Sequence, residues 1–112
     1  MSKFGLSSDR TDVPFEAHLS ELEGNLKQIL LELREFVKSL DATVIEDVRP
    51  HRIVYAKTLN FRTFLDVQPG RGGLAIAIKY GRGASETSDL ISNDKDLEEI
   101  KPKISQAFLT IK

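Results

Sequence analysis

Residues 51–80 read HRIVYAKTLNFRTFLDVQPGRGGLAIAIKY, and this stretch decides the fold. Its apolar and polar side chains alternate over several short runs, and the segment 69–73 interrupts the alternation. Alternation with a period of two is typical of strands that bury one face, and a break rich in proline and glycine is typical of a hairpin loop. The stretch therefore predicts three consecutive antiparallel strands. Residues 43–48 predict a further strand before them, which Pro50 ends.

The predicted strands differ in how clearly they separate a buried side from an exposed side. The strand at 51–57 leaves both sides open, with Ile53, Tyr55 and Lys57 on one and Arg52, Val54 and Ala56 on the other. The next strand is expected to bury Phe61, Thr63, Leu65 and Val67, and to turn outward Asn60, Arg62, Phe64, Asp66 and Gln68. The last is expected to bury Leu74, Ile76, Ile78 and Tyr80, and to turn outward Ala75, Ala77 and Lys79. Inward and outward sets follow from the pleat of a strand.

Helical patterns stand on both sides of the strands. A short helical turn is expected at 14–19, because proline is tolerated at the start of a helix. Ser20 and Glu23 have the spacing of a capping box, and apolar residues then recur every three or four positions, which predicts a helix at 21–40. A last helix is expected from Asn93 or Asp94 onward, kinked at Pro102 or beginning again near Lys101.

The order of elements indicates an α+β fold. We expect a four-stranded antiparallel sheet with the N- and C-terminal helices packed on one face, in the order α-β-β-β-β-α. An extra edge strand near 88–91 is left open, within a polar connection at 81–93. Residues 1–13 are expected to form a loose N-terminal arm, and residues 14–112 a single domain.

Composition narrows the class of protein. The chain has 112 residues and no cysteine, which excludes disulfides, thiolate metal sites and a cysteine nucleophile. Its longest apolar run, 74–78, is far shorter than the ~20 residues of a membrane-spanning helix. The first residues lack the apolar core of a secretion signal. We therefore expect a cytoplasmic protein with no membrane partner.

Charge is distributed unevenly along the chain. Residues 1–48 carry five Lys and Arg against ten Asp and Glu, and residues 83–112 carry four against six. Residues 49–82 carry seven against one, a local net charge of +6 in a chain whose total is −1. Near charges count most because salt screens beyond ~8–10 Å, so a basic sheet could attract a polyanion. The alternative is that acidic helices neutralise the sheet.

The chain resembles a known family, the small domain of unknown function numbered 5655, sometimes labelled a predicted transport protein. The likeness covers roughly residues 15–110 and is carried by His18-Leu19, by Leu26, Ile29, Leu30 and Leu33, by 53–57, 64–69 and 74–78, and by Asp96-Leu97 with Ala107-Phe108. The connection at 81–93 departs from the family, because it is shorter and lacks a His/Gly-rich piece. Members are often attached to nuclease-like domains, which implies an accessory role near nucleic acid. Without a spanning segment, the chain is not expected to be a transporter itself.

No motif indicates catalysis, a metal or a cofactor. The two histidines, His18 and His51, have no second ligand at metal spacing, and His18 is expected to have a structural role at the start of a helix. No G-x-S-x-G motif would expose Ser20 as a nucleophile. The acidic residues at 93–96 lack the glycine and the later glutamate of a calcium loop, so helix capping is the expected role. We expect a protein that is not an enzyme.

The candidate binding residues lie on the outward sheet side and in two Gly-Arg-Gly turns. They are Arg52, Arg62, Phe64, Arg71, Lys79 and Arg82. Arginines and an aromatic side chain could hold phosphates and stack on a base. The turns are also explained by ordinary turn chemistry, and Phe64 could be covered by a loop, an arm or a second copy of the chain.

Three functions remain open. The first prediction is weak binding of nucleic acid or another polyanion through the basic sheet face. Its alternative is a homodimer that contacts through Phe64, Ala75 and Ala77, and salt dependence separates the two because phosphate contacts weaken with salt. A distant third is an enzyme acting through Asp66, Tyr55 and Arg71.

Overall fold

The computed structural model describes residues 13–57, 62–80 and 86–111. The elements are α1 (Phe15–Ser20), α2 (Asn25–Ser39), β1 (Ile45–Val48), β2 (Ile53–Lys57), β3 (Arg62–Gly70), β4 (Gly73–Lys79), β5 (Glu86–Ile91) and α3 (Asp94–Thr110). The strands form one antiparallel sheet in the order β1-β2-β3-β4-β5. The α+β class is confirmed, but the sheet has five strands and not four. The extra edge strand is β5.

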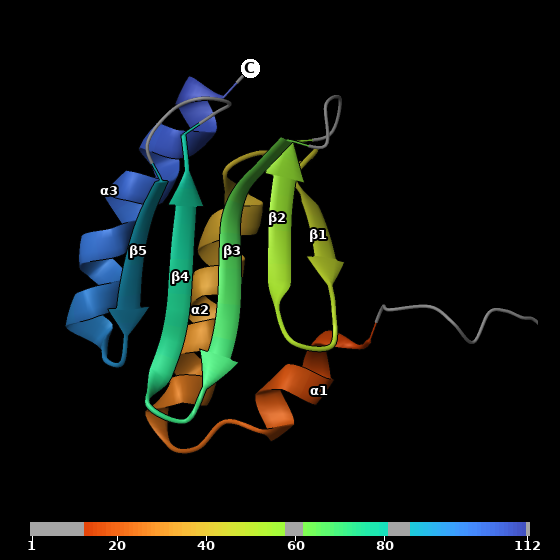
Figure 1. The fold of residues 1–112 in the computed structure, drawn as a ribbon, viewed down its shortest axis with the longest axis vertical. Coiled ribbons are helices and arrows are strands. Elements are labelled where there is room, and N and C mark those ends of the chain that lie inside the picture. The colour runs from red at the N-terminus through yellow and green to blue at the C-terminus, as the bar shows by residue number, and fades with distance from the viewer. Residues whose placement is uncertain (1–12, 58–61, 81–85, 112) are drawn as a thin grey trace, which may run out of the picture.

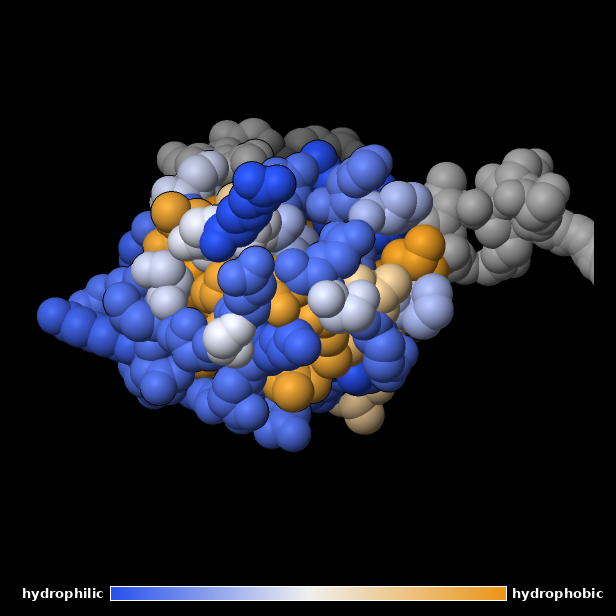
Figure 2. All heavy atoms as spheres, turned by 90° about the horizontal axis from the view of Figure 1, so that it is seen from below, coloured by the Kyte–Doolittle hydropathy of each residue, from blue (hydrophilic) through white to orange (hydrophobic). Residues whose placement is uncertain are grey.

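Helices α2 and α3 lie on one face of the sheet, while α1 lies beside the turn between β1 and β2 (Figure 1). Between these layers is the core, whose fully buried large side chains include Ile29, Leu30, Leu33, Ile53, Tyr55, Phe64, Leu65, Leu74, Ile76, Ile78, Ile91 and Leu97. Seen from the end that holds α1, apolar side chains show in the middle of a hydrophilic surface (Figure 2). The predicted helical stripe and the predicted inward set of β4 therefore meet in one core.

The start of α2 differs from the prediction. The Ser20 hydroxyl donates a hydrogen bond to the Ala17 carbonyl at 2.9 Å, so Ser20 belongs to the end of α1 and not to a capping box. Helix α2 begins at Asn25, after Gly24, whose φ of 57° lies in the left-handed region that favours glycine. The predicted start at residue 21 is wrong because Gly24 redirects the chain between two helices.

A β-bulge in β3 changes which side chains face outward. Tyr55 pairs with Leu65, whereas its neighbour Ala56 pairs with Thr63, so Phe64 is the extra residue. A bulge inserts one residue against its partner strand, and the alternation of side chains reverses beyond it. Phe64 is consequently buried, with its ring edge-on to the ring of Phe108 at a centroid distance of 5.3 Å.

The bulge also exchanges the sides of the sheet on which Arg62 and Thr63 were predicted to lie. Arg62 pairs with Lys57, whose ammonium lies 4.5 Å from the centroid of the Phe108 ring on the helix-covered side. By register, Arg62 therefore faces the helices. Its predicted place on the open side is wrong. Thr63 pairs with Ala56 and faces the open side, where the prediction had it buried. Phe61 and Asn60 lie outside the described residues.

Helix α3 runs without interruption from Asp94 to Thr110, with Pro102 inside it. It does not begin again near Lys101. The Asn93 side chain caps it by accepting a hydrogen bond from the Asp96 amide at 2.8 Å. The Asp96 carboxylate in turn accepts one from the Ser92 amide at 3.0 Å. Capping, as predicted, accounts for these acidic residues.

Among the described residues, no helix has both the length and the apolar character needed to cross a membrane.

Candidate binding face of the sheet

The sheet face without helices, which we call the outer face, carries the candidate site. Register and shared hollows place on it Ile45, Asp47, Arg52, Val54, Ala56, Thr63, Asp66, Gln68, Ala75, Ala77, Lys79, Ser88 and Leu90. The set mixes small, polar and charged side chains with three larger apolar ones, Ile45, Val54 and Leu90. It contrasts with the large apolar residues that the same strands turn toward the helices.

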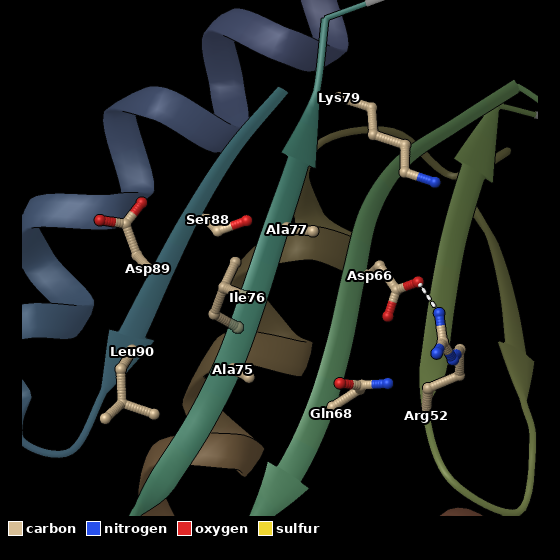
Figure 3. Close-up of a pocket in the computed structure, with 10 residues that line it drawn as sticks. All are labelled: Arg52, Asp66, Gln68, Ala75, Ile76, Ala77, Lys79, Ser88, Asp89 and Leu90. Carbon is tan, nitrogen blue, oxygen red and sulfur yellow. Dashed lines mark hydrogen bonds and ion pairs between the residues drawn. The ribbon is translucent and has the colours of Figure 1, made fainter. Parts of the chain in front are cut away.

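A hollow of about 380 Å³ lies over β3, β4 and β5 on this face. We call it the main hollow; the residues that line it are Arg52, Asp66, Gln68, 75–77, Lys79 and 88–90. Figure 3 shows Ala75 and Ala77 along its middle, with Gln68 and Asp66 from β3 on one side and Ser88 and Leu90 from β5 on the other. Its volume is within the range of ~300–1,000 Å³ typical of sites for small molecules.

An ion pair borders the main hollow. Nη1 of Arg52 lies 2.7 Å from Oδ2 of Asp66, and the Asp66 residue is only 7% exposed. The Arg52 side chain is 42% exposed and makes this single hydrogen bond within the described residues. Since a guanidinium has five N–H donors, most of them stay available to a ligand. Asp66 therefore fixes the position of Arg52 without using up its donors.

Lys79 and Leu90 stand near opposite ends of the main hollow (Figure 3). Within the described part of the chain, Lys79 has no hydrogen bond or ion pair. Leu90 pairs with Ala75 and is 62% exposed, one of two large apolar side chains this exposed among the described residues. Lys79 thus gives one end of the hollow a charged side chain and Leu90 gives the other an apolar one, while the ion pair of Arg52 with Asp66 stands at the side between them.

A second hollow of about 240 Å³ lies over β1 and β2 on the same face. Its lining includes Ile45, Val54, Ala56 and Thr63, and the ion pair of Asp47 with Arg49, at 2.8 Å, stands at its border. Val54 and Ala56 are buried, at 7% and 6% exposed. Both sides of β2 are therefore buried at its centre, which explains why its sequence did not show which side faces the core.

The predicted binding residues do not converge. Arg52 and Lys79 reach the main hollow, and Arg71 is exposed in the turn between β3 and β4. Arg62 and Phe64 face the helices, so their predicted place on the outer face is wrong. Arg82 lies outside the described residues. Of the part of the chain that is described, the outer face has no aromatic side chain on which a base could stack.

Sequence reasoning missed the hollow itself. The signal for it is the pair Ala75 and Ala77, which alternate with Leu74, Ile76 and Ile78 in β4. Alanine is depleted in strands, and two alanines on the outward side leave room above the sheet. The role of Asp66 could not be seen, because its ion pair with Arg52 depends on the pairing of β2 with β3.

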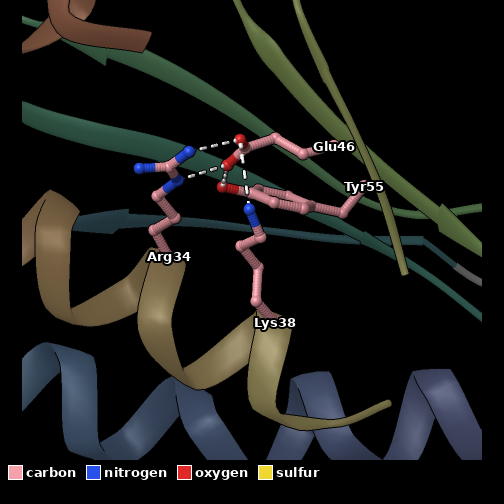
Figure 4. A network of polar contacts seen from close by, with 4 residues as sticks. All are labelled: Arg34, Lys38, Glu46 and Tyr55. Carbon is pink, nitrogen blue, oxygen red and sulfur yellow. Dashed lines mark hydrogen bonds and ion pairs between the residues drawn. The ribbon is translucent and has the colours of Figure 1, made fainter. Parts of the chain in front are cut away.

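A second polar cluster lies on the helix-covered face, where Glu46 of β1 meets α2 (Figure 4). The Arg34 guanidinium donates to both carboxylate oxygens of Glu46 at 2.9 Å, and the Tyr55 hydroxyl donates to one of them at 2.7 Å. Lys38 stands 3.8 Å from the same carboxylate. The cluster ties α2 to the edge of the sheet.

Ionisation in this cluster follows from its geometry. The hydrogen bond to Glu46 raises the pKa of Arg34 above its usual value. Burial, together with the negative charge of Glu46, raises the pKa of Tyr55 far above its usual value, so its hydroxyl stays protonated and keeps donating. Tyr55 is fully buried and lines neither of the two hollows described above.

The residues weighed for catalysis are not brought together. Tyr55 faces the helices, Asp66 faces the open side, and Arg71 stands in a turn at the end of β3. His18 is buried in the last turn of α1, and its Nε2–H donates to the Arg49 carbonyl at 2.6 Å, a contact that joins α1 to the turn between β1 and β2. No group of three or more His, Asp or Glu side chains in the described residues is placed to hold a metal ion.

Comparisons with models of protein families, with curated proteins and with solved structures find no match for this chain. The resemblance to family 5655 stays a prediction.

Proposed function

We propose that this protein is a non-catalytic binding domain that takes an anionic ligand on the outer face of its sheet, with the phosphates of nucleic acid as the first ligand class. The observation that carries the proposal is the pair of cations at the main hollow. Asp66 holds Arg52 at 2.7 Å, and Lys79 has no partner among the described residues. A cation fixed in place loses little conformational freedom when a ligand binds.

The number of available cations limits the strength of such binding. Arg49 pairs with Asp47, Lys57 donates to the Ile111 carbonyl at the end of α3, and Arg62 faces the helices. Arg52 and Lys79 remain on the outer face, with Arg71 in the neighbouring turn. Two or three phosphate contacts give a salt slope of about −1.4 to −2 for a single strand. We therefore expect weak and salt-sensitive binding.

The absence of aromatic side chains from the described outer face sets the specificity. Stacking on an aromatic ring contributes ~1–3 kcal/mol per base in single-strand binding proteins. Contacts to phosphates alone carry no sequence information. The proposed binding of nucleic acid therefore has no sequence preference.

Fluorescence anisotropy with a labelled oligonucleotide at low salt tests the proposal. Lys79→Glu should weaken binding, whereas Lys95→Glu should not, because Lys95 is an exposed residue of α3 away from the outer face. The two variants change the net charge equally, so a difference between them reports the position of the charge. The absence of binding by the unmutated protein at ~100 µM would remove nucleic acid as the ligand, since non-specific affinities are typically ~10⁻⁴–10⁻⁶ M.

Self-association is the second candidate, favoured by the exposure of Leu90. Phe64 is in the core and cannot form the predicted dimer contact, but Leu90 and Ala75 lie side by side on the outer face. Apolar contact between copies would be insensitive to salt. Sedimentation at micromolar concentration distinguishes the candidates: a dimer that Leu90→Lys dissociates supports self-association, and a monomer at low and high salt contradicts it.

A further inference from the structure

The shape and the charge of the main hollow point to one class of ligand. We infer that it binds a small amphipathic carboxylate, with the carboxylate beside Lys79 and Arg52 and an apolar chain running over Ala75 toward Leu90. The inference rests on the proposed anion-binding function and narrows it from any anion to a monoanion with an apolar body.

The hollow has the form of a groove along β4. Ala75 and Ala77 form its floor, and each is flanked by larger side chains on both neighbouring strands. Gln68 and Leu90 flank Ala75, while Asp66 and Ser88 flank Ala77. Larger or β-branched residues at the two alanine positions would fill the groove, and strands generally favour such residues. The groove is therefore a property of these two positions.

Polarity changes along β4, while the ion pair of Arg52 with Asp66 stands at the side of the groove, beside Ala77. Leu90 stands at the Ala75 end, and Lys79 lies four positions further along β4. At ~3.4 Å per residue, the distance from Ala75 to Lys79 along the strand is about 13 Å. Figure 3 shows the Lys79 and Arg52 side chains extending toward Asp66, away from Leu90. A ligand that follows this gradient has one charged end and one apolar end.

The charges of the side chains at the hollow favour a ligand with a single negative charge. On the outer face, Arg52 and Lys79 contribute two positive charges and Asp66 one negative charge, a sum of +1. Asp89 also lines the hollow, but it pairs with the inward-facing Ile76 and its carboxylate lies 3.7 Å from the ammonium of Lys103, which balances its charge. Asp66 is buried and bound to Arg52 through Oδ2, so it acts as a positioning residue that keeps the guanidinium beside the hollow. Its own charge repels a second negative charge on the ligand, which disfavours a phosphate monoester relative to a carboxylate.

Titration of the isotopically labelled protein with octanoate, followed by NMR, tests the inference, with octylamine and octanol as matched probes. We expect saturable shifts in β3, β4 and β5 with octanoate, and none with octylamine. Lys79→Glu and Ala77→Ile should each weaken octanoate binding at least ten-fold. Lys95→Glu and Ala42→Val, at exposed positions outside the outer face, should leave it unchanged.

Ala75→Val provides a second filling variant should Ala77→Ile fail to fold. Equal binding of octylamine and octanoate would overturn the inference. Unchanged octanoate binding by both Ala77→Ile and Ala75→Val would overturn it as well.

The same variants separate this inference from the proposed function. Oligonucleotide binding by a protein that does not bind octanoate would overturn the inference and leave the proposed function standing. Octanoate binding without oligonucleotide binding would support the inference and limit the function to small anions. If neither probe binds, the anion-binding function fails together with the inference.

Discussion

The two sides of β4 are built from different residues. Toward the helices the strand presents Leu74, Ile76 and Ile78, all fully or almost fully buried. Toward solvent it presents Ala75, Ala77 and Lys79, which line the main hollow. A single strand thus provides the centre of the core and the floor of a groove. The large side chains of the inner side fill the core, whereas the small side chains of the outer side leave space above the sheet.

The polar side chains of the two faces differ in how many partners they have. On the helix-covered face, Glu46 binds Arg34, Tyr55 and Lys38, so its carboxylate is surrounded by donors. On the outer face, Asp66 binds Arg52 alone and Lys79 stays unpaired within the described residues. Saturated groups stabilise the fold, whereas groups with free donors are available to a ligand.

Removal of packing from the inner side should have the largest effect. Leu33 of α2 is fully buried against the sheet. Leu33→Ala should lower the free energy of unfolding by ~2–5 kcal/mol, because a large side chain is replaced by a cavity. Denaturation in urea measures the loss. A loss below ~1 kcal/mol would show that α2 is not part of the core.

The turn between β3 and β4 should show the second-largest effect on stability. Gly73 has a φ of 150°, and a Cβ there would stand 2.5 Å from the Ile91 carbonyl oxygen. Gly73→Ala should therefore destabilise the protein by ~1–3 kcal/mol and displace β5, which carries Leu90. Gly72→Ala, one residue away, meets nothing within 4 Å and is the matched control. Equal losses for the two variants in thermal unfolding would contradict this account.

Alkaline pH tests the saturated cluster of the inner face. The folded pKa of Tyr55 is raised above the value of ~10 in an unfolded chain. Its contribution to stability is therefore complete below pH ~10 and is lost as the pH rises above that value, since only the unfolded state then releases the proton. Tyr55→Phe should cost ~1–2 kcal/mol at neutral pH, through loss of the hydrogen bond to Glu46, and should flatten the alkaline decline. An unchanged decline in Tyr55→Phe would exclude Tyr55 as its cause.

Filling the outer side should have the smallest effect on stability. Ala77→Ile adds a β-branched side chain where there is space, so the free energy of unfolding should change by less than ~0.5 kcal/mol. The same replacement should still weaken the proposed octanoate binding at least ten-fold. A loss as large as that of Leu33→Ala would mean that the outer face is packed like the inner one, and the contrast between the faces would fail.

Prediction from sequence succeeded where local pattern and packing agreed. The stripe of α2, the inward set of β4 and the cap of α3 were all predicted, because each depends on residues near one another in the chain. The outward set of β3 was predicted correctly at Asp66 and Gln68 and wrongly at Arg62, Thr63 and Phe64, because Phe64 occupies a bulge that the alternation of residues does not reveal. This shift of register turns Arg62 and Phe64 toward the helices. Arg52 and Lys79 are therefore the cations that reach the main hollow.

By itself, the sequence determined the α+β class, the position of the helices before and after the strands, and the small outward residues Ala75 and Ala77 of β4. These properties follow from periodicity and from residue size, which are local. Only the tertiary structure decided that β5 completes the sheet, that Asp66 holds Arg52, and that the basic segment divides between two faces. The physical reason is that strand register and the bulge arise from pairing between distant residues, and a shift of one residue exchanges the faces of a strand.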